Sequence, residues 1–218
     1  MNPAWLHIHD RLLAAFGPQH WWPGDTPFEV MTGAVLTQNT AWGNVEKAIA
    51  RLKAANALSG RALLDLEPAT LADLIRPAGY FNVKTRRLKA LCAYLEQEGA
   101  LDDPVLLAQA APLPELRRRL LAVNGVGEET ADSILLYALD LQVFVVDAYT
   151  RRLFTRLGRL RGDERYSEIQ AAFTAHLPPD RALYNEYHAL IVHLGKEFCR
   201  PRPRCGACPL NAQCPVAG

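Results

Sequence analysis

The sequence has 218 residues, half of them hydrophobic, and a formal net charge of +1 at neutral pH. A chain of this length and composition can bury one large core or two smaller ones, as a globular protein does. No apolar run approaches the roughly 18 residues that cross a bilayer. The first ten residues also lack the basic-then-apolar pattern of an export signal. We therefore expect a cytoplasmic protein with no membrane partner.

The positive charges are unevenly distributed. The chain carries 19 arginines and five lysines, and clusters of them can create a local positive face although the total charge is near zero. A cluster of this kind can equally be a solvated helix face. The clusters are Arg86–Arg87–Lys89, Arg117–Arg118–Arg119, Arg151–Arg152, and Arg200, Arg202 and Arg204.

Helical periodicity runs through nearly the whole chain. Apolar residues recur three or four positions apart, which predicts helices rather than strands, with loops at 17–27 and 100–104. The predicted helices cover residues 4–16, 28–38, 43–55, 60–66, 69–75, 83–98, 113–123, 128–139, 148–158, 166–177 and 181–198. Only residues 143–146, "VFVV", read as extended, and four residues cannot make a sheet. The predicted fold class is all-α.

The stretch "NGVGEETADS", residues 124–133, predicts a tight turn between two helices. Gly125 and Gly127 permit positive φ angles and a close approach of another backbone. The second helix begins with unpaired N–H groups, and together with the helix dipole these form an anion site that suits a nucleic-acid phosphate. The alternative for Glu128 and Glu129 is that acidic residues are simply favoured in a first helical turn.

Four of the five cysteines lie within "CRPRPRCGACPLNAQC" near the end of the chain, whereas Cys92 sits in an apolar segment and reads as a core residue. The C-x5-C-x2-C-x5-C spacing brings four thiols together on a short loop, which predicts a metal site. Because no export signal is found, disulfides are the weaker explanation. Zinc and a [4Fe–4S] cluster both satisfy this ligand set. The four ligands would be Cys199, Cys205, Cys208 and Cys214.

Several stretches together resemble one family. The segment "LAVNGVGEETADSILLYALDLQVFVVDAYTRRLFTRLG", with "GAVLTQNT", "RPAGYFNVKTRRLKAL" and "HLGKEFCRPRPRCGACPLNAQC", is similar in sequence and order to the endonuclease III superfamily of helix-hairpin-helix DNA glycosylases. The resemblance implies a six-helix barrel domain with the helix-hairpin-helix at residues 21–138. It also implies a second helical domain, formed by 1–20 and 139–218, that carries a C-terminal [4Fe–4S] loop, with zinc less expected. The first gap between the cysteines holds five residues where endonuclease III has six.

The resemblance also identifies candidate catalytic residues. Where the bifunctional members have a lysine in the hairpin, which forms a Schiff base with the sugar, this chain has Glu129. A carboxylate cannot form an imine, so water must be the attacking group. Asp147 matches the family's essential aspartate, whose charge stabilises the oxocarbenium character of the sugar. From the residues alone, Asp147 is also a good helix N-cap.

Other stretches are similar to one branch of the family, the endonuclease III-like 3-methyladenine DNA glycosylases. Trp22 and Trp42 match the aromatic residues that stack on the flipped base in that branch, whereas Trp21 has packing as an equal alternative. A cationic alkylated purine would gain cation–π attraction between such rings and is already a good leaving group. Packing against the barrel is the alternative for Trp22 as well as for Trp21.

The resemblance implies further contacts with double-stranded damaged DNA. Gln38 matches the residue that fills the space left by a flipped base, and Tyr80 matches a wedge in the opposite strand; both could instead be structural. The remaining expected DNA-binding residues belong to the hairpin and to the cysteine-rich loop: Asn124, Gly125, Val126, Gly127, Arg200, Arg202 and Arg204. Their phosphate contacts should make binding weaken with salt. We expect a monomer.

The leading hypothesis is therefore a base-excision-repair N-glycosylase, monofunctional, that hydrolyses the glycosidic bond of an alkylated purine and has weak or no lyase activity at abasic sites. One alternative is a glycosylase/lyase for oxidised pyrimidines that recruits another lysine. A second is a protein that binds damaged DNA with little or no turnover, which the Glu129 position and the near-neutral charge would suit.

Overall fold

The computed structural model describes residues 3–217, and every regular element assigned within that range is helical. The predicted all-α class is confirmed. The chain divides into two compact units: one contains Pro23–Leu141, and the other joins the segment up to Trp22 to the segment from Gln142 onward. We call them the hairpin unit and the cysteine unit. No helix among the described residues is long and apolar enough to cross a membrane.

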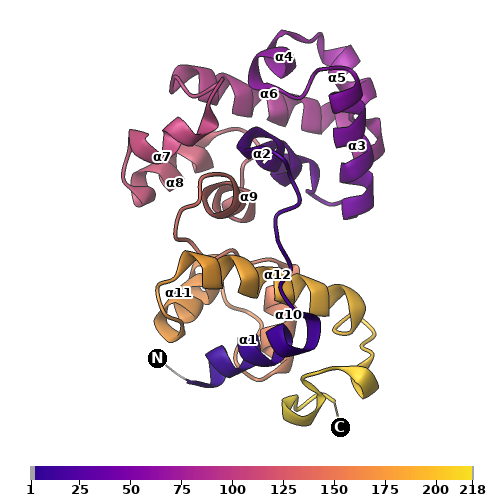
Figure 1. Ribbon diagram of the computed structural model, residues 1–218, viewed down its shortest axis with the longest axis vertical. Coiled ribbons are helices and arrows are strands. Elements are labelled where there is room, and N and C mark those ends of the chain that lie inside the picture. The colour runs from indigo at the N-terminus through magenta and orange to yellow at the C-terminus, as the bar shows by residue number, and fades with distance from the viewer. Residues whose placement is uncertain (1–2, 218) are drawn as a thin grey trace. The chain divides into compact units, whose positions relative to one another are not determined.

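The hairpin unit is built around one buried helix. Its helices are α2 (Pro27–Leu36), α3 (Trp42–Ala54), α4 (Gly60–Asp65), α5 (Pro68–Leu74), α6 (Phe81–Gln97), α7 (Leu107–Ala110), α8 (Leu113–Ala122) and α9 (Glu128–Ser133), with short 3-10 turns η1 (Arg76–Ala78) and η2 (Pro104–Leu106) and the π-helical turn η3 (Ile134–Ala138). All residues of α2 after the first are buried. A helix that is apolar on every side belongs in a core, and α2 packs against α3, α6, α9 and η3 (Figure 1).

The start of α2 shows how local sequence fixes an element. The Thr26 side chain accepts a hydrogen bond from the Glu29 N–H, and Pro27 occupies the first helical position. A threonine cap and a proline at that position both favour helix initiation. The helix ends at Leu36, earlier than the predicted residue 38, so Gln38 lies in the turn that follows.

The cysteine unit is a smaller helical assembly with an aromatic core. It contains α1 (Pro3–Phe16), α10 (Ala148–Arg156), α11 (Tyr166–His176), α12 (Arg181–Glu197) and the 3-10 turns η4 (Cys205–Ala207) and η5 (Asn211–Gln213). Rings from four segments pack together there. The Phe144 and Phe173 rings are stacked with centroids 3.9 Å apart, and the Trp5 and Phe154 rings are tilted with centroids 4.8 Å apart. The buried Tyr187 hydroxyl donates to the Trp5 carbonyl at 2.7 Å, which satisfies the polar end of an otherwise apolar ring.

One feature of the fold differs from the sequence-based expectations. The segment predicted as one helix over 128–139 is an α-helix only to Ser133 and then widens into the π-helical turn η3. The segment 143–146 is buried and forms no strand, in agreement with the expectation that four residues make no sheet. The unit boundaries fall near the predicted domain boundaries, although Trp21 and Trp22 group with the cysteine unit. That six helices of the hairpin unit form a barrel stays a prediction.

Candidate active site

Asp147 begins α10 as its N-cap. Its Oδ1 accepts hydrogen bonds from the Thr150 N–H at 2.7 Å and from the Thr150 hydroxyl at 2.8 Å. An N-cap carboxylate satisfies a helix N–H that has no partner within the helix and lies at the positive end of the helix dipole. The side chain is 10% exposed, so its second oxygen is the one left for other partners.

That second oxygen faces a histidine. The Nε2 of His188, on α12, lies 3.6 Å from Asp147 Oδ2, and the His188 side chain is 6% exposed. This distance is longer than an ordinary hydrogen bond, so the contact is chiefly electrostatic. Burial by itself would raise the pKa of Asp147, but His188 and the two Thr150 donors outweigh it, and the pKa lies below the ordinary value of 3.8. Asp147 is therefore a carboxylate at neutral pH.

The residues just before Asp147 are held by α11 instead of a sheet. The Tyr166 hydroxyl accepts from the Val146 N–H at 3.2 Å, and the Gln170 amide donates to the Phe144 carbonyl at 2.7 Å. Buried backbone groups need such partners when no strand ladder supplies them. The position of Asp147 is thus fixed by α10 on one side and α11 on the other.

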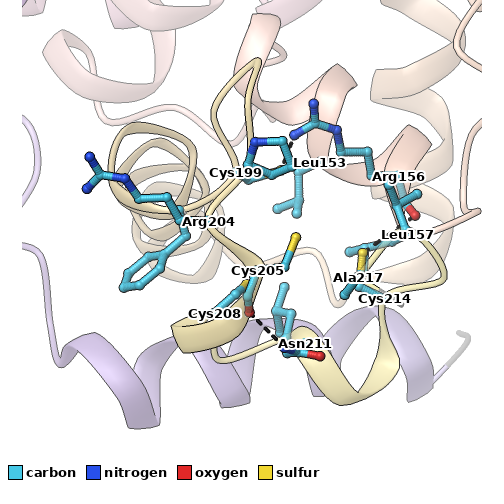
Figure 2. Close-up of a pocket in the computed structure, with 14 residues that line it drawn as sticks. Leu153, Arg156, Leu157, Cys199, Arg204, Cys205, Cys208, Asn211, Cys214 and Ala217 are labelled. Atoms are coloured by element: carbon cyan, nitrogen blue, oxygen red, sulfur yellow. Dashed lines mark hydrogen bonds between the residues drawn. The ribbon is translucent and has the colours of Figure 1, made fainter.

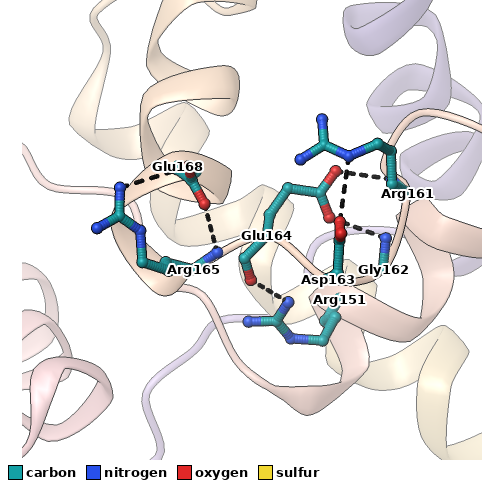
Figure 3. Close-up of polar contacts among 7 residues, drawn as sticks. All are labelled: Arg151, Arg161, Gly162, Asp163, Glu164, Arg165 and Glu168. Atoms are coloured by element: carbon teal, nitrogen blue, oxygen red, sulfur yellow. Dashed lines mark hydrogen bonds and ion pairs between the residues drawn. The ribbon is translucent and has the colours of Figure 1, made fainter.

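The connection from α10 to α11 is itself tightly hydrogen-bonded, as Figure 3 shows. The Glu164 carboxylate accepts from the Arg161 N–H at 2.6 Å and from the Gly162 N–H at 2.8 Å. These backbone donors lower the pKa of Glu164. Arg151, on α10, donates to the Glu164 carbonyl at 2.5 Å. The loop is therefore fixed to α10 through Arg151, just before the start of α11, and these two helices hold Asp147.

The helix-hairpin-helix of the hairpin unit is formed by α8, the turn 123–127 and α9. Arg117 of α8 makes a bidentate pair with Asp132 of α9, at 2.7 and 3.0 Å, and Asp132 is completely buried. Gly125 has a φ of +85°, and a Cβ at that position would lie 2.2 Å from the Arg87 side chain. The turn thus requires glycine at 125 both for its backbone angle and for space.

The predicted residues of this hairpin differ in exposure. Val126 is buried and anchors the turn, whereas Asn124, Gly127 and Glu129 are exposed. Glu129 is in the first turn of α9, and Glu128 beside it lies 3.6 Å from Arg117. The exposed positions are the ones that a bound phosphate could approach.

Gln38 is tied to the hairpin. Its amide nitrogen donates to the Gly125 carbonyl at 3.0 Å and to the Thr130 hydroxyl at 2.9 Å, and Arg87 donates to its amide oxygen. Tyr80 is the contrasting case: its side chain is 70% exposed, and its φ is +45° at the start of α6. A large aromatic residue so exposed on a left-handed turn is unusual and suits a contact surface.

The predicted base-pocket tryptophans belong to different units. Trp42 is the first residue of α3 in the hairpin unit, and Trp22 ends the first segment of the cysteine unit; both are half-buried. Trp21 lies beside Trp22 with centroids 5.3 Å apart, and the Lys196 ammonium stands 5.4 Å over its ring. Trp21 thus makes packing and cation–π contacts within its own unit.

The four C-terminal cysteines line one hollow that is partly open to solvent (Figure 2). Apolar side chains, among them Leu153, Leu157 and Leu210, complete its wall. Burial is the main cause that raises the pKa of Cys208, and the three neighbouring cysteines raise it further. Within residues 3–217, no three His, Cys, Asp or Glu side chains converge closely enough to hold a single metal ion. The thiols therefore surround a space instead of meeting at one point.

Two arginines of α10 connect this hollow to the helix that Asp147 begins. Arg152 donates to the Cys199 carbonyl at 2.7 Å. Arg156 donates to the Cys199 sulfur at 3.3 Å and to the Arg200 carbonyl at 2.7 Å. Because Sγ is the metal-binding atom of cysteine, the Arg156 guanidinium also places positive charge where thiolates would need it.

The three predicted arginines of the cysteine-rich loop are not equivalent. Arg202 and Arg204 are exposed, whereas Arg200 is half-buried and donates to the Lys196 carbonyl at 2.5 Å. Arg202 and Arg204 are thus the two whose guanidinium groups are open to a large ligand.

Each unit gathers its own set of predicted residues. The cysteine unit holds Asp147, Trp22, the four thiols and the loop arginines; the hairpin unit holds Glu129, Gln38, Tyr80, Trp42 and the hairpin turn. Sequence reasoning missed the supporting roles of three residues: Arg87, Arg117 and Lys84. Lys84 had a readable signal, because it occupies the same helical stripe as the buried Leu88, Leu91 and Leu95 of α6.

Similarity to known proteins agrees with this arrangement. Residues 32–179 match the profile of the HhH-GPD superfamily of base excision DNA repair proteins. A protein of Methanocaldococcus jannaschii, named as a proposed DNA repair glycosylase, is 46% identical over 207 residues, which are 95% of this chain and 94% of that protein. Endonuclease III of Sulfolobus acidocaldarius is 29% identical over 189 residues, 86% of this chain and 81% of its own length.

Two solved structures extend the comparison. The H. pylori 3-methyladenine DNA glycosylase MagIII, solved with 1,N6-ethenoadenine, is 30% identical with a TM-score of 0.75, over 88% of this chain and 96% of that one. A non-covalent endonuclease III–DNA complex shares the fold at a TM-score of 0.83 and 23% identity, over 99% of this chain and 95% of that one. The chain belongs to the HhH-GPD superfamily of base excision DNA repair proteins and is one of its DNA glycosylases.

Proposed function

We propose that this protein is a monofunctional glycosylase that hydrolyses the N-glycosidic bond of an alkylated purine, such as 3-methyladenine, in double-stranded DNA. The observation that carries this proposal is a pair of acids: Asp147 held as a carboxylate at a helix N-cap, and Glu129 where a Schiff-base lysine would be needed. With no amine at that position, the route through an imine is closed, and water is the nucleophile.

Asp147 would act on the sugar. As the glycosidic bond breaks, positive charge moves from the alkylated base to the anomeric carbon and ring oxygen, and a fixed carboxylate near the sugar stabilises that charge more than it stabilises the uncharged sugar of the ground state. The two Thr150 hydrogen bonds hold Oδ1 and leave Oδ2 as the oxygen able to face the sugar or accept a proton from water. The low pKa of Asp147 keeps it charged for this role.

The proposed substrate class follows from how easily the base leaves. A purine alkylated at N3 or N7 carries positive charge, so it needs little protonation by the enzyme and is attracted to aromatic faces. Trp22 and Trp42 are the half-buried aromatic candidates for stacking. The 30% identity to a 3-methyladenine DNA glycosylase of H. pylori supports the same class.

DNA would be held without sequence readout. The backbone of the hairpin turn, exposed at Asn124 and Gly127 and half-buried at Gly125, offers N–H groups to a phosphate. Gln38 and Tyr80 would occupy the space left by the flipped nucleotide, and Arg202 and Arg204 would contact phosphates. We propose that one copy of the chain is sufficient for this.

The four cysteines would hold a [4Fe–4S] cluster. Four thiolates around a hollow fit a cluster in which each iron takes one cysteine sulfur, better than a single zinc ion that all four must reach at about 2.3 Å. When bound, the cluster would cross-link the C-terminal loop. Visible absorption and an iron content of about four per chain would support this assignment; zinc in its place would overturn it.

The proposed function is tested by base release from methylated DNA. Wild-type protein should liberate free 3-methyladenine, and Asp147→Asn should reduce the single-turnover rate by about a thousand-fold or more. Asparagine caps helices as well as aspartate does, so this variant should still fold, losing only the stability that the Asp147 charge contributes, and it isolates the effect of that charge on base release. Activity that survives Asp147→Asn would contradict the mechanism.

A second assay separates the proposal from the lyase alternative. Borohydride reduces an imine between an amine and an abasic sugar to a stable adduct, which a hydrolytic enzyme never forms. Wild-type protein should give no trapped adduct while it releases base. An adduct would favour a glycosylase/lyase, and selective binding of damaged DNA with no base released would favour a binding protein.

A further inference from the structure

Lys84 is a buried lysine whose ammonium contacts two separate loops. On α6, it is 1% exposed, and its Nζ donates to the Leu36 carbonyl at 2.8 Å and to the Ala78 carbonyl at 2.7 Å. Leu36 ends α2, and Ala78 ends η1. Each acceptor is a backbone carbonyl at the C-terminal end of a helical element, where no later N–H of the same helix can donate to it.

These two carbonyls are close in sequence to the residues proposed to enter DNA. Leu36 is two residues before Gln38, and Ala78 is two residues before Tyr80. The backbone N–H of Lys84 also donates to the Tyr80 carbonyl at 3.0 Å. One residue thus hydrogen-bonds to the base of both inserting loops.

Satisfying two carbonyls does not by itself require a lysine. A neutral donor or water could do so, whereas burying an ammonium carries a desolvation cost. Burial, followed by the neighbouring Arg87, lowers the pKa of Lys84 to about 8, so the charged form still dominates at pH 7. What the ammonium offers is three donors radiating from one atom. It can therefore bind carbonyls from two loops at once and set the distance between them.

The two loops differ in what else holds them. The Gln38 side chain is bound by Arg87, Gly125 and Thr130. The Tyr80 side chain is 70% exposed, and its position depends on the backbone of its turn. A rigid backbone there lowers the entropy lost when the aromatic ring enters a duplex.

We propose that Lys84 is a positioning residue that holds the Gln38 loop and the Tyr80 turn at the separation needed for both side chains to enter DNA together. This role rests on the proposed function. Lys84 touches neither DNA nor substrate, and acts only through the two loops.

The same helix supplies a matched control. The Lys89 ammonium donates to the Leu64 carbonyl at 2.8 Å and to the Leu66 carbonyl. Those carbonyls lie at the end of α4 and just after it, in a segment with no proposed DNA-binding residue. Lys84→Met and Lys89→Met each remove one ammonium that links two backbone carbonyls, but only the first concerns the inserting loops.

The experiment compares binding of the full chain to two duplexes, one with a tetrahydrofuran abasic analogue and one undamaged. A 2-aminopurine opposite the analogue reports local unstacking through its fluorescence. Lys84→Met should lower the preference for the abasic duplex by about ten-fold, as the loss of buried hydrogen bonds predicts. It should also reduce the fluorescence change, whereas Lys89→Met should stay within about two-fold of wild type.

A second background excludes a purely structural effect. In a chain carrying Gln38→Ala and Tyr80→Ala, Lys84→Met should cause no further loss of preference, because nothing remains to be positioned. Equal losses in the Lys84 and Lys89 variants, or a loss that persists in this background, would overturn the proposal. If Lys84→Met does not fold, Lys84→Gln and Lys89→Gln are compared by the same criteria.

The wild-type measurement separates this proposal from the one on which it rests. Wild-type protein should prefer the abasic duplex whatever base it releases. If it shows no preference, the proposed function fails, and with it the role of Lys84. If wild-type protein prefers the abasic duplex but Lys84→Met and Lys89→Met lose that preference equally, only the proposed role of Lys84 fails.

Discussion

His188 Nε2 lies 3.6 Å from Asp147 Oδ2, and both side chains are almost fully removed from solvent. Two opposing effects act on the pKa of Asp147. Burial raises it, whereas the contacts with His188 and Thr150 lower it by more, so the net shift is downward. Because the folded pKa lies below the unfolded one, Asp147 stabilises the fold above the unfolded pKa. That contribution is lost as the pH falls through the folded value.

Removing His188 should therefore move the acid limb of activity. We expect single-turnover base release by His188→Leu to decline at distinctly higher pH than that of wild type, because burial then raises the pKa of Asp147 with less opposition. His188→Gln, which retains a donor, should fall between them. His193→Leu is the control, since His193 is on the same helix but contacts Gln19. Superimposable profiles for His188→Leu and wild type would show that the contact does not tune Asp147.

The Arg117–Asp132 pair should dominate the stability of the hairpin. Arg117→Met leaves the completely buried Asp132 carboxylate without its bidentate partner, which should cost about 3 kcal/mol of unfolding free energy. Arg118→Met is the matched control, because Arg118 pairs with Glu115 in solvent, where ion pairs contribute little. Urea unfolding of both variants measures the difference. A similar midpoint for the two would mean that α8 and α9 are held by apolar packing alone.

The two hairpin glycines should separate stability from DNA binding. Gly125→Ala places a Cβ at a φ of +85° and against Arg87, so we expect a loss of about 1–2 kcal/mol or more. Gly127 is the N-cap of α9 with a φ of −91°, and beyond its chain neighbours no atom lies within 4 Å of the position that a Cβ would take, so Gly127→Ala should lose only the capping preference for glycine over alanine, about 1 kcal/mol or less. If a phosphate approaches that exposed backbone, Gly127→Ala should still weaken binding to duplex DNA. Unchanged binding would place the phosphate elsewhere.

Much of this architecture was predictable because the chain is built from amphipathic helices. Periodicity located α2, α6 and α12, and α4 and α12 begin after the N-cap residues Ser59 and Asp180, whose side chains accept from the helix backbone. Asp147 is an N-cap, as its local sequence indicated. These predictions succeed because each depends on residues a few positions apart.

The remainder depends on contacts that are distant in sequence. The π-helical turn η3 has the same apolar pattern as an α-helix, so periodicity could not reveal it. Arg87 reaches Gln38 across 49 positions, and His188 meets Asp147 through the packing of α10 and α12. A single sequence offers no signal for such pairs, whereas a charge on an apolar stripe, as at Lys84, is a signal that can be read.

Glu129→Lys tests whether position 129 faces the sugar. Glu129 is exposed in the first turn of α9, so a lysine fits sterically and should lose only about 0.3–1 kcal/mol of interaction with the helix dipole. We expect this variant, unlike wild type, to form a borohydride-trapped adduct with abasic DNA. Glu128→Lys, the neighbouring acid, should give none. Without trapping in Glu129→Lys, the proposed alignment of α9 with the sugar would be wrong.

Arg202 and Arg204 should account for part of the salt dependence of DNA binding. Both are exposed on the cysteine-rich loop, and removing one phosphate-binding charge should reduce the slope of log affinity against log salt by about 0.9. Replacing both by glutamine should lower the slope by about two. The control is Arg161→Gln with Arg165→Gln, because these arginines are also exposed but pair with Asp163 and Glu168. The control removes the same number of positive charges. An equal change of slope in both double variants would indicate a general effect of net charge. A change only in the Arg202 and Arg204 variant identifies these two residues as phosphate contacts.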